Sequence, residues 1–140
     1  MDISPRMVEV ARQLNPGIPF DQGDMRALDV PDSSLAGVVA FYSIIHLARS
    51  VVPRALDEMM RVLRPGGVAL ISVHGGEGEL HADEFLGQTV SIDASLFQPP
   101  EMKTLAEGAG FKVEEVLSRE PYDFEFQSQR VYIWASRVPV

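Results

Sequence analysis

The stretch that decides the fold is Arg61-Val62-Leu63-Arg64-Pro65-Gly66-Gly67-Val68-Ala69-Leu70-Ile71-Ser72-Val73. The Pro-Gly-Gly turn inside it cannot continue a helix, because proline lacks a backbone N–H and glycine readily adopts left-handed backbone angles. Residues 68–73, which follow the turn, are apolar except for Ser72 and have the length of a strand. Such a run is typical of a strand in a parallel sheet with helices on both faces. The stretch therefore predicts a helix that reverses into a buried strand.

Upstream of this turn the same alternation of helix and strand repeats. Apolar side chains recur at helical spacing before the turn, and a second continuous apolar run precedes that helix. Ser4 followed by Pro5 is a typical helix start, with the hydroxyl as N-cap and the proline in the first turn. The predicted elements are a helix from Ser4-Pro5 to residue 14, a short strand at 18–20, a polar loop at 21–34, a strand at 35–41 and a helix at 53–63.

Downstream of the turn, residues 75–98 are rich in glycine and acids and are expected to be irregular. Pro99-Pro100 then opens a helix, and two strands follow it at residues 111–117 and 130–136. Alternating strands and helices predict an α/β fold with a Rossmann-like three-layer sandwich. Because the last two strands are consecutive, the sheet is expected to be mostly parallel with an antiparallel last strand.

Composition restricts the classes of partner. At 140 residues the chain has room for a single domain over 1–140. A net charge of −8 without a Lys/Arg cluster argues against nucleic acid and anionic membranes and favours a small-molecule partner. The chain contains no cysteine and no apolar run long enough to span a bilayer, so a cytoplasmic protein is expected.

Several short motifs, taken in order, resemble the class I S-adenosylmethionine-dependent methyltransferases that act on small molecules. They begin with Met1-Asp2-Ile3-Ser4-Pro5-Arg6-Met7 and Gln22-Gly23-Asp24-Met25, and continue with Phe41-Tyr42-Ser43-Ile44-Ile45-His46-Leu47 and the Pro-Gly-Gly turn. Each motif alone is a weak signal, but together they extend over essentially the whole chain. The resemblance implies S-adenosylmethionine as the cofactor and methyl transfer by in-line displacement.

The resemblance also implies a role for particular residues. Asp2 would accept hydrogen bonds from both ribose hydroxyls, and Asp24 from the adenine amino group. Ile3 and Met7 would lie against the adenine ring, and the backbone of Met25 would read a ring nitrogen. The methionine end of the cofactor would be lined by Phe41, Tyr42 and Ser43.

The glycine-rich loop that follows the first strand of this family has no counterpart, because Gly17 is the first glycine of the chain. We therefore expect an amino-terminally truncated domain whose first βα unit is missing. One hypothesis is a misread GTG valine start codon at Met1. A real truncation would leave a central strand edge unpaired, and homo-oligomerisation would then be expected.

His46 is the candidate catalytic residue, because it follows the carboxyl end of a buried strand, where open α/β sheets place their ligands. It could deprotonate the methyl acceptor, or it could simply cap a short helix. His74 has the same position after the next strand. The spacing of His46 and His74 matches no metal signature, so no metal is expected.

Two functions remain open alongside each other. The first is a small-molecule methyltransferase. The second is a non-catalytic remnant that serves as an oligomerisation or partner-binding domain. A nicotinamide-dependent oxidoreductase is disfavoured by the lack of a Gly-x-Gly-x-x-Gly motif and by the two consecutive strands at the end.

Overall fold

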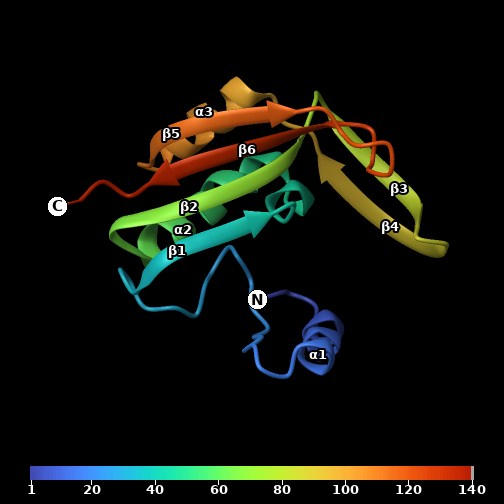
Figure 1. Cartoon of the computed structure of the whole chain (residues 1–140), viewed down its shortest axis with the longest axis horizontal. Coiled ribbons are helices and arrows are strands. Elements are labelled where there is room, and N and C mark those ends of the chain that lie inside the picture. The colour runs from blue at the N-terminus through green and yellow to red at the C-terminus, as the bar shows by residue number, and fades with distance from the viewer. Residues whose placement is uncertain (140) are drawn as a thin grey trace.

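The computed structural model describes residues 1–139 and contains a four-stranded sheet, a separate hairpin and three α-helices. Figure 1 shows α2 and α3 behind the sheet, the hairpin beyond its upper end and α1 apart from it. The elements in order are α1 (Pro5–Leu14), β1 (Leu35–Phe41), the 3₁₀ turns η1 (Ile44–His46) and η2 (Arg49–Val51), α2 (Val52–Val62), β2 (Leu63–Gly75), β3 (Glu79–Phe85), β4 (Gln88–Ser95), α3 (Pro99–Gly108), β5 (Lys112–Arg119) and β6 (Gln129–Ser136).

The four-stranded sheet has the order β1-β2-β6-β5. β1 and β2 are parallel, and β6 is antiparallel to both of its neighbours. This confirms the antiparallel last strand that the two consecutive strands predicted. It also places β6 between β2 and β5, so the final strand contributes to the middle of the sheet.

The turn that begins β2 reverses the chain as expected. Gly66 has φ 76°, and a Cβ on Gly67 would lie 2.8 Å from the carbonyl oxygen of Arg64. The first glycine is required by the backbone angle and the second by close packing. Both α2 and the strand after this turn are confirmed.

The core lies between one face of the sheet and helices α2 and α3. Alternate residues of β2 and β6, such as Ile71 and Ile133, are fully buried there against Leu56 and Met102. On β1, by contrast, Val39 is 63% exposed and Phe41 53% exposed. The expectation that this strand is covered on both sides is therefore not met within the described residues, since α2 and α3 both contribute to the core of one face.

The prediction that residues 75–98 are irregular is wrong. It contains the hairpin β3–β4, joined by Leu86 and Gly87, whose φ angles are 51° and 76°. Two consecutive positive φ angles match the twist of paired strands, so a two-residue turn closes the hairpin. The glycine at the second turn position was the available signal in the sequence.

The amino-terminal segment was predicted in part. Helix α1 begins at Pro5, and Ser4 Oγ accepts a hydrogen bond from the backbone N–H of Met7 at 3.3 Å, as the N-cap pattern predicted. The strand expected at residues 18–20 is wrong: this segment is coil, followed by a single parallel bridge between Asp2 and Gln22. One bridge forms because the described residues offer no further strand beside this segment to extend the pairing. Among the described residues, no helix is long and apolar enough to cross a bilayer.

Candidate functional site

The carboxyl ends of β1 and β2 bring several predicted residues together. Tyr42 follows β1 directly, and its ring stacks on the imidazole of His74 with centroids 4.9 Å apart. Tyr42 has φ 48°, and its backbone N–H donates to the carbonyl oxygen of Ser72 at 3.0 Å. A non-glycine residue with positive φ is sparsely populated and is often found at functional sites. The strained turn places the Tyr42 ring over the end of β2.

Tyr42 is held as a neutral phenol. Its hydroxyl lies 3.2 Å from the hydroxyl of Tyr132. Burial, followed by this hydrogen bond, raises the pKa of Tyr42 to about 12. The phenol can therefore donate or accept a hydrogen bond at neutral pH, but it does not act as a nucleophile or base there.

His46 lies at the end of η1 beside the hairpin. Its Nδ1 is 3.0 Å from the backbone carbonyl oxygen of Asp93 in β4. A carbonyl oxygen only accepts hydrogen bonds, so Nδ1 carries the proton in the neutral ring and Nε2 has a free lone pair. The side chain is exposed. The geometry leaves His46 able to accept a proton, as a general base requires.

The two predicted adenosine-binding acids lie on adjacent backbone segments. Gly23 N–H donates to the Asp2 carbonyl oxygen at 2.9 Å, which places Asp2 beside the strand-like segment that leads to Asp24. Asp2 Oδ1 accepts from the backbone N–H of Ser4 at 2.8 Å. Among the described residues, no hydrogen bond is made to Asp2 Oδ2, so this oxygen is free to accept another.

Asp24 is already engaged. Its carboxylate accepts from the Arg26 guanidinium, through Nη2 at 2.6 Å and through Nε, which is shared between the two oxygens at 2.9 and 3.0 Å, and also from the Arg26 backbone N–H at 2.8 Å. These bonds lower the pKa of Asp24 to about 2. The acid is therefore ionised at neutral pH, and a ligand would share its carboxylate with Arg26.

The apolar residues predicted around adenine divide into two kinds. Ile3 and Met7 are 62% and 56% exposed, so their apolar surface is accessible to a ligand. Met25 instead packs against the core. No hydrogen bond, ion pair or aromatic contact joins Asp2, Ile3 or Met7 to Phe41, Tyr42 or Ser43 among the described residues. The predicted site thus consists of two groups on separate segments.

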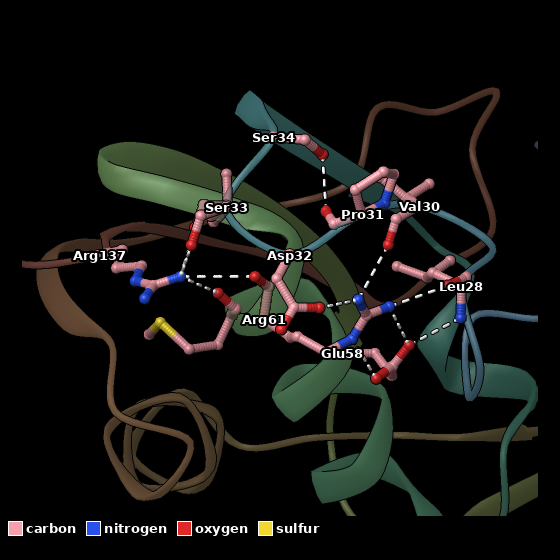
Figure 2. Close-up of polar contacts among 11 residues, drawn as sticks. Leu28, Val30, Pro31, Asp32, Ser33, Ser34, Glu58, Arg61 and Arg137 are labelled. Carbon is pink, nitrogen blue, oxygen red and sulfur yellow. Dashed lines mark hydrogen bonds and ion pairs between the residues drawn. The ribbon is translucent and has the colours of Figure 1, made fainter.

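Sequence reasoning missed the clamp that fixes the loop before β1. Figure 2 shows the Arg61 guanidinium at its centre: it donates to the carbonyl oxygens of Leu28 and Val30, both at 2.9 Å, and pairs with Glu58 and Asp32. Glu58 in turn accepts from the backbone N–H of Leu28 at 2.7 Å. The Arg61 side chain lowers the pKa of Glu58 to about 2. Residues 28–32 are therefore tied to α2.

Arg137 extends this clamp. It follows β6, and its guanidinium donates to Leu63 O at 2.6 Å and to Ser33 Oγ at 3.1 Å (Figure 2). The clamp positions the chain between the Asp24 turn and β1. No motif in the sequence predicted this clamp, because the atoms that accept hydrogen bonds from Arg61 and Arg137 are mostly backbone carbonyl oxygens.

A second missed group lies at the end of the sheet where β5 ends and β6 begins. Arg119 pairs with Glu125 through two hydrogen bonds of 2.8 Å, and this pair lowers the pKa of Glu125 to about 2. Arg130 lies directly opposite His74 in the β2–β6 register. Its Nη1 is 3.1 Å from His74 Nδ1. This brings a buried cation to the carboxyl end of β2.

Comparison with known proteins agrees with the described geometry. Residues 1–67 match the family described as "Methyltransferase domain". The chain is 32% identical over 102 residues to the malonyl-[acyl-carrier protein] O-methyltransferase of Serratia marcescens, covering 64% of this chain and 39% of that protein. It is 32% identical over 124 residues to a probable S-adenosylmethionine-dependent methyltransferase of Mycolicibacterium smegmatis, covering 84% of this chain and 44% of that protein. The chain thus spans less than half the length of these curated relatives.

The fold is shared with solved methyltransferase structures. The structure of a S-adenosylmethionine-dependent methyltransferase from Methanosarcina mazei superposes with a TM-score of 0.85 at 17% identity, over 99% of this chain and 81% of that one. Such low identity establishes the fold, and the two curated relatives with the matched domain add the sequence relationship. The chain therefore resembles S-adenosylmethionine-dependent methyltransferases in sequence, matches a methyltransferase domain over residues 1–67 and shares the fold of a solved methyltransferase.

Proposed function

We propose that the protein takes part in S-adenosylmethionine-dependent methyl transfer to a small molecule. The observation that carries the proposal is the arrangement at the sheet end: Tyr42 and His46 follow β1 where the ligands of open α/β sheets bind. The similarity to methyltransferases supports the cofactor. The net charge of −8 supports a small acceptor rather than a nucleic acid or an anionic membrane.

The residues present fit the adenosine half of the cofactor. Asp2 has a carboxylate oxygen free for a ribose hydroxyl, and Ile3 and Met7 offer exposed apolar surface for the adenine ring. Asp24 is ionised and would accept from the adenine amino group while retaining Arg26, with the Met25 backbone beside it. The cofactor, when bound, supplies an activated methyl group on a sulfonium. The described residues contribute no glycine-rich loop to the methionine half.

At the methionine end we assign Phe41, Tyr42 and Ser43 to the lining of the site, and His46 to proton removal from the acceptor. The free lone pair on His46 Nε2 supports this role, because Nδ1 is fixed as a donor to the Asp93 carbonyl oxygen. The leaving group of a sulfonium is already good. The protein's main contribution would therefore be alignment of the nucleophile with the methyl group.

The experiment that tests the proposal is calorimetric titration of the chain with S-adenosylhomocysteine. We expect micromolar binding, about −8 kcal/mol, that Asp2→Ala and Asp24→Ala each weaken about tenfold or more. Asp29→Ala is the matched control, because Asp29 lies exposed on the same loop. An absence of binding up to millimolar concentration, with a cooperative thermal melt, would overturn the proposal for this chain.

A second candidate function is a non-catalytic domain that assembles with another copy or a partner. Its support is β1, which pairs with β2 alone among the described strands and carries the exposed Val39 and Phe41. Unpaired strand edges recruit further strands. Sedimentation of the chain distinguishes the candidates: a stable oligomer that binds no S-adenosylhomocysteine would favour assembly.

A further inference from the structure

Arg130 is a buried cation without a close carboxylate. Its exposed fraction is 4%, and the nearest acid is Glu125, whose Oε1 lies 3.9 Å from Arg130 Nε. Both Glu125 oxygens are already used by Arg119 at 2.8 Å. Burying a charge is costly unless it is well paired, and this ion pair is long and shared with Arg119, so the charge of Arg130 is only partly compensated.

The Arg130 guanidinium is held in place through its Nη1 atom. The three polar contacts of the guanidinium within hydrogen-bonding distance all involve Nη1, whose two hydrogens are shared among Ser128 O at 2.7 Å, Ser128 Oγ at 2.9 Å and His74 Nδ1 at 3.1 Å. Nη2 has no partner among these residues. The guanidinium thus keeps donors available for a planar anion, with which it would form paired hydrogen bonds.

His74 presents a second donor, and its tautomer follows from the geometry. His74 Nδ1 lies 3.1 Å from the Arg130 guanidinium, which only donates, and 2.9 Å from Ser128 Oγ, which accepts from Arg130 and can donate its own hydrogen. A proton on Nδ1 would point at the guanidinium cation, so Nδ1 accepts and the proton of the neutral ring lies on Nε2. Burial, followed by the nearby charge of Arg130, lowers the pKa of His74, which favours this neutral form. His74 is therefore a hydrogen-bond donor, the opposite of His46, which is fixed with Nε2 as an acceptor.

Further polar groups are buried near Arg130 and His74. Only three polar residues are buried in the described part of the chain, and Ser72 and Arg130 are two of them. Ser72 Oγ has no hydrogen-bond partner there. By strand register Ser72 lies opposite Tyr132 and Arg130 opposite His74, so all four share one face of the sheet. An unsatisfied buried hydroxyl beside a buried cation indicates polar contents for this face.

We infer that Arg130 and His74 Nε2–H form a subsite for a carboxylate of the methyl acceptor. Two arginines, Arg119 and Arg130, face one carboxylate, Glu125, so this cluster has an excess of one positive charge in a chain of net charge −8. The His74 ring is stacked on Tyr42 at a centroid distance of 4.9 Å and meets Phe126 edge-on at 5.5 Å. They provide flat apolar contacts for the acceptor's body. The inference rests on the proposed function, since it assigns the acceptor.

The test is an NMR titration of histidine-labelled protein with benzoate and, separately, with the neutral analogue benzamide. We expect benzoate to shift the His74 ring resonances and to bind at least about tenfold more tightly than benzamide. Long-range proton–nitrogen correlations should place the His74 proton on Nε2. Equal affinity for benzoate and benzamide, or a proton on Nδ1, would overturn the subsite.

Variants sharpen this test. Arg130→Met should weaken benzoate about tenfold or more, whereas Arg64→Met should bind as the natural chain does, because Arg64 is exposed and has no polar contact among the described side chains. Arg130 is buried, so a thermal melt must first show that the Met variant folds. If it does not fold, Arg130→Lys, which keeps the charge but loses the planar fork, should weaken benzoate several-fold. Unchanged affinity in the folded Arg130 variant overturns the inference.

The titration needs no cofactor, which separates the two proposals. Benzoate binding without S-adenosylhomocysteine binding would leave the carboxylate subsite standing and remove the methyltransferase proposal. Binding of S-adenosylhomocysteine without any preference for benzoate over benzamide would leave the methyltransferase proposal standing and remove the carboxylate subsite.

Discussion

The amino-terminal segment, residues 1–27, and the sheet with its two helices differ in how they are held. In the first, Val8 is the one buried residue of α1 and is not part of the main core, and the backbone pairing consists of two isolated bridges, Asp2–Gln22 and Asp24–Ala27. In the second, whole faces of β2 and β6 are buried. The residues assigned to adenosine lie in the weakly held segment, and those assigned to the acceptor lie in the packed one. Cofactor binding should therefore be more sensitive to local order than acceptor binding.

The largest effect should come from equal truncations in the two regions. Val131 in β6 and Val8 in α1 are 0% and 4% exposed, so Val→Ala removes the same atoms from comparable burial. Val131→Ala should reduce the free energy of unfolding by about 1.5–3 kcal/mol, because it leaves a cavity in the main core. Val8→Ala should leave the main urea transition almost unchanged. Equal losses in both variants would show that the segment and the sheet unfold as one unit.

The clamp between the two regions should show a pH-dependent effect of intermediate size. The folded-state pKa of Glu58 is about 2, below the ordinary value of 4.5, so its stabilising effect is present above about pH 4.5 and is lost as the pH falls toward 2. Glu58→Gln should lower the melting temperature at pH 7 by about 2–5 °C, and the difference should shrink at pH 3. Glu9→Gln is the control, since Glu9 pairs with Arg6 on an exposed surface. A difference that stays constant with pH would exclude the carboxylate as its cause.

The smallest effect concerns Arg26. Its guanidinium keeps the pKa of Asp24 at about 2, and both side chains lie at the surface. Arg26→Ala should raise the pKa of Asp24 toward its ordinary value while the thermal midpoint stays within experimental error. The pKa is measured by NMR titration of the carboxyl carbon. An Asp24 that still titrates near pH 2 in this variant would contradict the assigned cause.

Sequence patterns were most successful where the signal is local. Ser4-Pro5 marked the start of α1, the Pro-Gly-Gly turn marked the change from α2 to β2, and the strand predicted at residues 130–136 is β6. Local signals failed at residues 18–20, which lack a neighbouring strand in the described structure, and at the hairpin, whose turn depends on Leu86 adopting a positive φ. A leucine there is not a turn signal.

The candidate site was predicted only as a set of positions. The residues that follow β1 were correctly placed at the end of the sheet, and His46 and His74 were both noticed. Their opposite tautomers could not be predicted, because they depend on the Asp93 carbonyl oxygen and on the Arg130 guanidinium. Nor did the arginine clamp around residues 28–34 have a local signature, since its acceptors are backbone oxygens.

By itself, the sequence determined the order of most helices and strands and the turns between several of them, because these follow from periodicity, capping and backbone preference over a few residues. Its short motifs also indicated the family that the chain resembles. The tertiary structure alone decided that Arg130 lies against His74, although 56 residues separate them in the chain. That contact arises from the register of β6 on β2, which is fixed by burial of a whole face. The charge, the tautomer and the unsatisfied hydroxyl at this end of the sheet all follow from that register.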